Sequence, residues 1–383
     1  MNVQTLNLAE SEALAELWPE RCQYWQRALE ASIPTRKRRE RQKRPLILTG
    51  QGISIRVDKG ALLVREGLTH YPQGVSEHRF FKGSLDLPER IVLLDGSGSL
   101  TLDALDWLEA EGVTLIRLKW DGRFVTAIGS GGSSIDIEKL DWQRQTRSDP
   151  KARIALAQEL LTVKAQNTLE TLRGWIPESV KRDRAIETIE NLKARIEAGG
   201  HTRLNDLLGL EGSIASSYFA AWQALPLRWK GTSRNPIPED WKAIFSRAAL
   251  RDEKHRNQSA THPVNAMLNY AYGMLMARKQ IAAIANGYDV TLGIVHDRRT
   301  RDRGKTPCFA LDLMEPERPI IDRAIIEIIR EHTFSPADFT VTHKGTVKVN
   351  PELARASAKW TINASDHNCR LSHDYSTQKA FFI

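Results

Sequence analysis

The stretch "VTLIRLKWDGRFVTAIGSGGSS", residues 113–134, decides the fold class of this chain, because the strand pattern ends within it. Its first part reads as two strands joined at Asp121 and Gly122, a dipeptide typical of hairpin turns. The "SGGSS" that follows, residues 130–134, has the composition of a linker. The sequence therefore predicts a strand-rich region before this point and a different region after it.

Strand and turn patterns dominate the residues before the linker. "ISIRV", residues 53–57, alternates with period two, and the "DKG" after it predicts a hairpin with "ALLVREG". "RIVLLD", residues 90–95, reads as an apolar strand, and residues 99–112 read as a short helix. "GSGS", residues 96–99, lacks the spacing of a phosphate-binding loop, and we interpret it as a turn. We expect one compact β-rich domain over residues 45–135.

The pattern after the linker is mostly helical. "SDP", residues 148–150, offers a helix N-cap followed by proline, and residues 151–175 then carry an apolar stripe with helical spacing. The same spacing predicts further helices over residues 178–197, 213–225, 239–251, 263–286 and 318–332. We therefore predict an α+β fold, in which the N-terminal β-rich domain is followed by a larger all-α catalytic domain over residues 136–340.

The two ends of the chain differ from the middle. Residues 1–44 read as an N-terminal helix, over 8–32, that forms an appendage and runs into a basic linker. In "TRKRRERQKR", residues 35–44, seven of ten residues are Lys or Arg, which is typical of a solvated linker but also suits an auxiliary DNA contact. Residues 341–383 form a C-terminal tail, and for its polar stretch "TINASDHNCRLSHDYSTQK", residues 361–379, we expect disorder or docking to a partner.

Composition narrows the class of protein. The 383-residue chain has 55 Lys and Arg against 47 Asp and Glu, and this net charge of +8 favours a polyanionic partner, with nucleic acid first. Cys22, Cys308 and Cys369 are too widely spaced for a disulfide framework or a zinc site, which fits a reducing cytoplasm. No apolar run approaches the roughly 20 residues that span a bilayer, and the acidic start is unlike a signal peptide.

Three segments of the helical region carry titratable side chains that could perform chemistry. "LLGLEGSIASSYFAAW", residues 207–222, places Glu211 at the start of a helix, where a carboxylate favours the helix dipole. "LGIVHD", residues 292–297, ends an apolar stretch in His296, and a lone histidine is more often structural than a ligand. "ALDLMEPERP" adds Asp312 and Glu315, which could equally be carboxylates at a helix start.

Together these side chains indicate more than each does alone. Carboxylates and one imidazole from separate helices of a basic protein are the ligand types that hold Mg²⁺ or Mn²⁺ for phosphodiester chemistry. "DRRTRDRGK", residues 297–305, follows His296 with five basic residues where phosphates would need to be held. The same segment could be an exposed loop, and periodicity does not choose between the two readings.

The order of four segments closely resembles one family. "LTVKAQNTLETL" (161–172), "LLGLEGSIASSYFAAW", "HPVNAMLNYAYGMLMARKQIAAIANGYDVTLGIVHD" (262–297) and "FALDLMEPERPIID" (309–322) are similar, in this order, to the CRISPR-associated endonuclease/integrase family Cas1, the enzyme of spacer acquisition. Residues 45–129 also resemble the N-terminal β-domain of that family. The resemblance thus covers roughly residues 45–340, and it implies the fold predicted above.

The resemblance assigns roles to individual positions. Glu211, His296 and Asp312 match the three metal ligands of the family, which are also its catalytic residues, and Glu315 would be a neighbouring group that supports them. Phe309 stands where some members have a further acidic residue, so the resemblance implies three ligands here and not four.

Other matched positions concern packing and DNA. Asn265, Asn269, Tyr270 and Tyr272 match positions that we interpret as packing and DNA-side contacts. Lys164 and Asn167 match a "KxxN" motif that we expect near the site. The residues expected to bind DNA are Lys164, Arg298, Arg299, Arg301 and Arg303.

The resemblance also implies an activity. Mg²⁺ or Mn²⁺ would polarise the scissile phosphate of a CRISPR repeat while the 3′-OH of a protospacer DNA attacks it, and water as nucleophile would give cleavage instead. The implied partners are double-stranded DNA, a second copy bound through the β-domain, and the small protein Cas2, in the cytoplasm. Two alternatives stay open: a casposase-like mobile-element integrase or repair nuclease of the same family, and a non-catalytic DNA-binding scaffold in which the three residues are structural.

Overall fold

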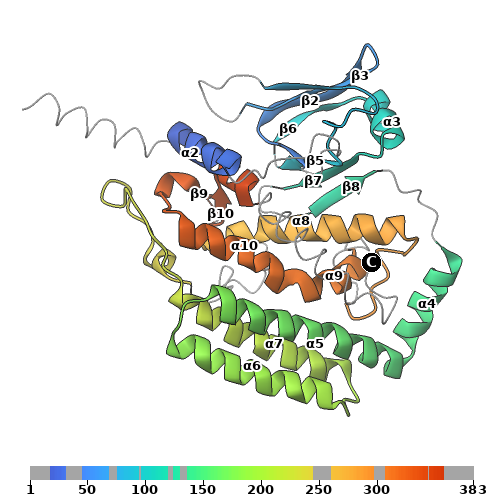
Figure 1. Cartoon of the computed structure of the whole chain (residues 1–383), viewed down its shortest axis with the longest axis vertical. Helices are drawn as coiled ribbons and strands as arrows, with labels where there is room; N and C mark the ends of the chain where they lie inside the picture. The colour runs from blue at the N-terminus through green and yellow to red at the C-terminus, as the bar shows by residue number, and fades with distance from the viewer. Residues whose placement is uncertain are drawn as a thin grey trace, which may run out of the picture.

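The structure is a computed structural model, and it describes residues 18–31, 45–68, 76–94, 96–119, 124–129, 136–244, 260–296, 307–343 and 345–357. A strand-rich region lies at one end of the molecule and a helical region at the other (Figure 1). This arrangement confirms the predicted α+β fold. Among the described residues, no helix combines the length and the apolar character that crossing a membrane requires.

The described residues of the first region form two four-stranded sheets. Its elements are β1 (Leu46–Leu48), β2 (Gln51–Asp58), β3 (Ala61–Arg65), β4 (Glu77–Phe80), β5 (Arg90–Leu94), β6 (Ser97–Leu100), α3 (Leu102–Ala110), β7 (Thr114–Leu118) and β8 (Phe124–Ile128). The strand orders are β1-β5-β7-β8 and β4-β3-β2-β6, with β2 and β3 as the predicted hairpin. Lys59 and Gly60 turn it with φ of 48° and 78°, as the "DKG" pattern indicates.

The segment "GSGS" is not the turn that the sequence predicts. Gly96 has a left-handed φ of 80°, but Ser97, Gly98 and Ser99 belong to β6, which pairs in parallel with β2. A Cβ on Gly98 would overlap the carbonyl oxygen of Ile53. The glycine is therefore there so that two strands can approach closely, a role that a composition rule for turns does not detect.

Seven α-helices make up most of the described helical region. They are α4 (Ile137–Ser148), α5 (Pro150–Trp175), α6 (Val180–Ala198), α7 (Leu204–Ala221), α8 (Pro263–Ala285), α9 (Cys308–Met314) and α10 (Arg318–Glu331). Short 3₁₀ helices are η1 (Trp222–Ala224), η2 (Glu239–Lys242), η4 (Glu315–Glu317) and η5 (Pro336–Asp338). Helix α8 contacts the sheet β1-β5-β7-β8 through β7 and β8, α10 lies between α8 and α5, and α6 and α7 pack on α5 (Figure 1).

Two predicted helices differ from the structure. Helix α7 begins at Leu204 rather than at residue 213, because its buried Leu207, Leu210 and Ile214 outweigh the low helix propensity of its glycines. Glu211 is consequently inside the helix and not at its start. Of the helix predicted over residues 239–251, the described part holds only η2, and residues 245–251 lie outside the described residues.

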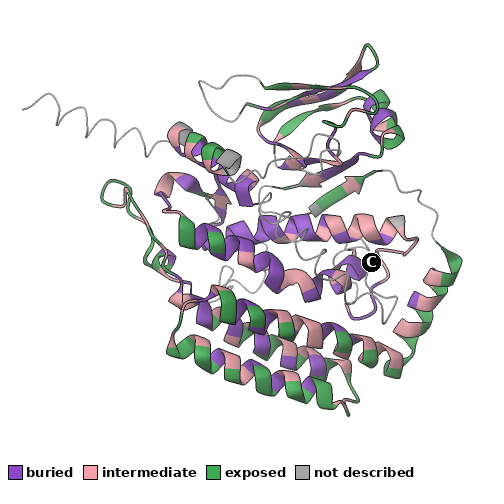
Figure 2. Ribbon diagram, viewed as in Figure 1, coloured by how far each residue is buried: buried purple, intermediate pink, exposed green. Residues whose placement is uncertain are grey.

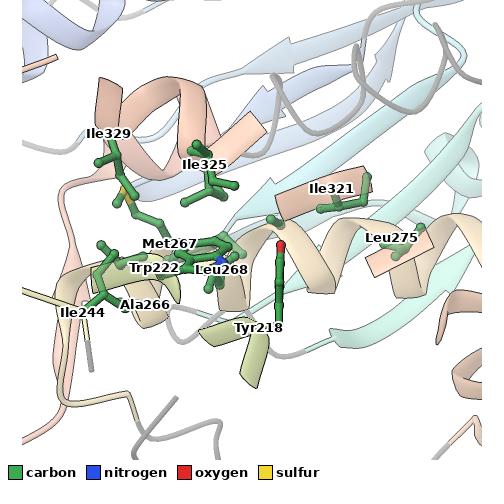
Figure 3. Close-up of a cluster of buried hydrophobic side chains, with 14 of the residues drawn as sticks. Tyr218, Trp222, Ile244, Ala266, Met267, Leu268, Leu275, Ile321, Ile325 and Ile329 are labelled. Atoms are coloured by element: carbon green, nitrogen blue, oxygen red, sulfur yellow. The ribbon is translucent and has the colours of Figure 1, made fainter. Parts of the chain in front are cut away.

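The core of the helical region surrounds α8 and α10. Both helices are buried along much of their length (Figure 2). Figure 3 shows side chains of α8, α10 and the end of α7 meeting in one cluster, with Trp222 against Met267 and with Ile325 close by. Because α8 is covered by apolar neighbours on several sides, it gives the site a rigid base.

The N-terminal helix α2 (Trp18–Ala31) is not the appendage that the sequence predicts. Arg21 Nε and Nη2 donate to the two carboxylate oxygens of Asp338 at 2.6 and 2.7 Å, and Trp25 Nε1 donates to the same carboxylate at 3.0 Å. The side chains of Arg21 and Trp25 are almost fully buried. An amphipathic pattern shows that such a helix has a buried face, but not which part of the chain covers it.

Part of the predicted C-terminal tail is also folded. Strands β9 (Phe339–Val341) and β10 (Val347–Val349) form an antiparallel pair, and residues 351–357 are helical. Cys22 Sγ lies 3.2 Å from Asn350 Oδ1, so α2 rests on this segment. Residues 345–357 are thus part of the fold, while residues 358–383, which include the polar stretch 361–379, lie outside the described residues.

Candidate active site

Five titratable side chains converge where α5, α7, α9 and η4 meet. Lys164 comes from α5, Glu211 from α7, Asp312 from α9 and Glu315 from η4, and His296 ends the segment between α8 and the residues that precede α9. A small cavity is lined by Ala157, Leu160, Leu161, Leu208, Glu211, Val295, His296, Asp312 and Glu315. Polar groups gathered at a cavity with apolar walls are typical of a functional site.

Asp312 is fully engaged by the chain itself. Its Oδ2 accepts hydrogen bonds from the backbone N–H groups of Ile294 and Val295, at 2.6 and 3.1 Å. Its Oδ1 accepts from the backbone N–H of His296 at 2.9 Å and lies 2.7 Å from the Nδ1 of the same residue. The residue is 1% exposed. Asp312 therefore fixes residues 294–296, and it does not cap α10.

His296 is oriented by this carboxylate. With Nδ1 against Asp312, the other ring nitrogen, Nε2, lies 3.8 Å from Glu315 Oε1. Burial by itself lowers the pKa of His296, but the hydrogen bond and charge of Asp312, together with the charge of Glu315, raise the pKa above its usual value. Nε2 is thus the nitrogen that is left to face the second carboxylate.

Glu315 is held between two cations. Its Oε1 pairs with Arg318 at 2.8 Å and its Oε2 with Lys164 Nζ at 2.6 Å. Burial by itself raises the pKa of Glu315, but Arg318, Lys164 and His296 outweigh burial and lower the pKa to about 2. The carboxyl group is therefore ionised at neutral pH although the residue is buried.

Lys164 bridges the two glutamates of the site. Its ammonium donates to Glu211 Oε1 as well as to Glu315 Oε2. Burial by itself lowers the pKa of Lys164, but Glu315 and Glu211 raise it. Lys164 was expected near the site and as a DNA contact, and the structure places it inside the site. The "KxxN" pattern pointed to this residue, but nothing in its spacing indicates which partners it pairs with.

Helix α5 fixes the segment that carries Glu315. Asn167 Nδ2 donates to the Pro316 carbonyl at 2.8 Å, and Thr171 Oγ1 donates to the Pro319 carbonyl at 3.0 Å. Together with Lys164 these residues lie at i, i+3 and i+7, so one face of α5 supplies all three contacts. The hydrogen bond of Asn167 to the Pro316 carbonyl explains why the "KxxN" motif ends in an amide side chain.

Two tyrosine side chains contact the residues of α10 that lie next to the site. Asp322 of α10 accepts from Tyr272 at 2.6 Å and from Tyr218 at 3.0 Å. The guanidinium of Arg318 lies 5.1 Å from the centre of the Tyr272 ring. Asn265 and Asn269 of α8 are buried, in agreement with a packing role, and DNA-side contacts by these residues stay a prediction.

The structure brings together Glu211, His296, Asp312 and Glu315, the four acidic and imidazole side chains that the sequence singled out. Arg298, Arg299, Arg301 and Arg303, expected to bind DNA, lie outside the described residues.

The donor set fits a hard divalent cation. Within the described part of the chain, no three His, Cys, Asp or Glu side chains are close enough to share one ion as they stand. The reason at this site is that the Lys164 ammonium lies between Glu211 and Glu315. Two carboxylates that already face one positive charge, with an imidazole nitrogen beside them, are the ligands that Mg²⁺ or Mn²⁺ takes.

Comparison with known proteins gives one family. The family model described as CRISPR associated protein Cas1 matches residues 46–360. A CRISPR-associated endonuclease Cas1 of Thermus thermophilus is 28% identical over 313 residues, which cover 81% of this chain and 83% of that protein. A CRISPR-associated endonuclease Cas1 of Methanospirillum hungatei is 28% identical over 224 residues, 56% of this chain and 57% of that protein.

Solved structures show the same fold. A casposase bound to integration product has a TM-score of 0.66 at 22% identity, over 88% of this chain and 92% of that one. A Cas1 protein from Thermotoga maritima has a TM-score of 0.62 at 14% identity, over 89% and 99%. A chain of a Cas6-RT-Cas1–Cas2 complex has a TM-score of 0.61 at 22% identity, over 86% of this chain and 33% of that one.

Proposed function

Because the chain belongs to the Cas1 family of CRISPR-associated proteins, we propose that it is a metal-dependent DNA integrase and endonuclease of CRISPR adaptation. The observation that carries this proposal is that Glu211 and Glu315 both pair with the buried ammonium of Lys164, while His296 Nε2 lies 3.8 Å from Glu315. The curated relatives named above carry the name endonuclease, which supports an enzyme rather than a scaffold.

We assign the metal ligands as Glu211, His296 through Nε2, and Glu315. The sequence expectation was Asp312 in place of Glu315. Both oxygens of Asp312 already accept hydrogen bonds from three backbone amides and His296, whereas Glu315 faces Lys164, Arg318 and the free ring nitrogen. Asp312 then acts on the site by orienting His296, as carboxylates behind metal-bound histidines do.

The chemistry is phosphodiester exchange. When bound, Mg²⁺ or Mn²⁺ polarises the scissile phosphate and stabilises charge on its oxygens. The residues of the chain prepare the site: Arg318 keeps Glu315 ionised, and Asp312 holds His296 with Nε2 towards Glu315. A DNA 3′-OH that attacks in line joins one strand to the target and releases the target's own 3′-OH. Water in the same position gives cleavage.

We propose double-stranded DNA, Cas2 and a second copy of the chain as partners, in the cytoplasm. The excess of 55 basic over 47 acidic residues supports a DNA partner. Two of the solved neighbours are a casposase bound to integration product and a complex that contains Cas2. Dimerisation through residues 45–135 and phosphate contacts by Arg298, Arg299, Arg301 and Arg303 remain predictions.

The casposase similarity favours one second candidate, a mobile-element integrase that uses the same site. The two functions differ in the DNA that is joined. A preference for short duplexes and a CRISPR repeat, strengthened by Cas2, supports CRISPR adaptation, whereas a preference for terminal inverted repeats supports the second candidate.

The test is strand transfer of a labelled short duplex into supercoiled plasmid, with Mg²⁺, Mn²⁺ or EDTA, for wild type, His296→Ala and Glu315→Gln. We expect joined product that needs the metal and is lost in both variants, with DNA binding retained. No product from wild type with Cas2 present, but normal DNA binding, would instead support the scaffold.

A further inference from the structure

Lys164 lies between the two glutamates of the site. Its Nζ donates to Glu211 Oε1 and, at 2.6 Å, to Glu315 Oε2. The lysine side chain is only 11% exposed, so water does little to satisfy its three N–H groups. The ammonium is thus a built part of the site and not a surface charge that happens to be near.

The lysine is held in place by the helix that carries it. Asn167 and Thr171, on the same face of α5, bind the carbonyls of Pro316 and Pro319. These contacts set the distance between α5 and the Glu315 segment. Lys164 therefore meets Glu315 through two rigid elements, while Glu211 comes from a third, α7. In the absence of Lys164, nothing else in the described structure pairs with Glu211.

The net charge of the cluster determines how Lys164 responds when a divalent ion binds. The described cluster holds three carboxylates, of Asp312, Glu211 and Glu315, against the two fixed cations Lys164 and Arg318. An ion bound by both glutamates would lie beside the Lys164 ammonium, where like charges repel strongly because the surroundings are buried. The cluster becomes neutral if the ion enters and the ammonium moves out.

We propose that Lys164 is an internal counter-cation, which keeps Glu211 and Glu315 together without metal and leaves them when a divalent ion binds. This inference rests on the metal-dependent function proposed above. Its consequence is that the acidic site is assembled before the metal arrives. The lysine also weakens metal binding, because its two ion pairs must break first.

The first test compares Lys164→Gln with a matched control. Lys279 is 10% exposed in its side chain and pairs at 2.5 Å with Glu317, two residues after Glu315, so Lys279→Gln removes a similar pair without removing a partner of Glu211 or Glu315. Both variants should melt at lower temperature than wild type without metal. In calorimetric titration with Mn²⁺, Lys164→Gln should bind at least tenfold more tightly than wild type, and Lys279→Gln should bind like wild type.

The second test uses the unmodified protein and does not depend on the folding of a variant. The full chain is treated with an amine-acylating reagent, with and without Mn²⁺, and acylation at each lysine is measured by peptide mass spectrometry. We expect Lys164 to react slowly without metal and several-fold faster with it. Lys279 should react slowly in both conditions.

The outcomes separate this inference from the function on which it rests. Wild type that binds no Mn²⁺ would overturn the metal site and the counter-cation together. If wild type binds Mn²⁺ through Glu315 but Lys164 stays unreactive towards the acylating reagent, only the counter-cation proposal is overturned. Equal or weaker Mn²⁺ affinity in a folded Lys164→Gln would do the same, since it would make the lysine a permanent support of the bound state.

Discussion

Asp312 contacts His296 twice, because its Oδ1 lies 2.9 Å from the backbone nitrogen and 2.7 Å from Nδ1 of the same residue. One carboxylate oxygen thus fixes both the main chain and the ring of the histidine. A ring that is held at Nδ1 presents Nε2 to a ligand. In the ligand set that we propose, Asp312 therefore orients the histidine, and Glu315 is the carboxylate that would share the metal with it.

The two carboxylates should therefore respond differently to amide substitution. Asp312→Asn should weaken Mn²⁺ binding about 10- to 100-fold, because the ring loses its fixed orientation. Glu315→Gln should remove measurable Mn²⁺ binding, because it removes a ligand. Strand transfer should fall by orders of magnitude in both, with DNA binding nearly unchanged because Lys and Arg supply most of the affinity. Calorimetric titration distinguishes the two, and the opposite ranking would restore Asp312 as the ligand.

The stability of the fold should depend on pH through His262, the N-cap of α8. Its Nδ1 accepts from the Val264 N–H at 3.2 Å, and burial lowers its pKa from 6.5 to about 4. The unfolded chain therefore binds the proton more readily. The contribution of neutral His262 is complete above pH 6.5 and is lost as the pH falls towards 4, by at most about 3 kcal/mol.

His262→Asn tests this pH dependence. Asparagine keeps a capping oxygen but does not titrate in this range. Urea unfolding at pH 7 and pH 4.5 should show a smaller loss of unfolding free energy in the variant than in wild type. An equal loss in both would assign the acid sensitivity to other groups.

The buried pair of Arg21 and Asp338 should matter far more than an exposed pair. Arg21→Met leaves a buried carboxylate without its charged partner and should cost about 3–5 kcal/mol of unfolding free energy. Arg173→Met removes a pair whose two side chains are 49% and 51% exposed, and it should cost less than about 1 kcal/mol. Urea denaturation measures both, and similar costs would mean that α2 is not part of the cooperative fold.

Two glycines should respond to alanine with opposite signs. Gly98→Ala would force a methyl group into the backbone of Ile53 and separate β2 from β6, which we expect to cost more than about 3 kcal/mol. Gly209 lies inside α7, and an added Cβ there would meet no described heavy atom within 4 Å. Gly209→Ala should stabilise the protein by about 0.5–1 kcal/mol. Thermal melting of the two variants checks the contrast.

The sequence could predict the α+β order and the four side chains that meet at the site, because these depend on local periodicity and on specific motifs. It could not assign roles within the site. Asp312 and Glu315 are three residues apart in one motif, and only folding shows that the amides of residues 294–296 engage the first and that Lys164 engages the second. The contacts among α5, α7 and η4 join segments that are far apart in the sequence, and local sequence patterns do not reveal such contacts.

The contact between α2 and Asp338 also determines when α2 can pack into the fold during synthesis. Arg21 and Asp338 are separated by 317 positions in the sequence. At ribosomal rates of about 5–20 residues per second, the helix waits roughly 15–60 s for the carboxylate that receives it. During that time the residues that pack around Trp25 in the folded protein, such as Phe334, have not yet been made. The nascent chain must therefore keep this helix from wrong partners until Asp338 and the neighbouring strand β9 have been made, and synthesis that stops before Asp338 leaves the helix without this ion pair.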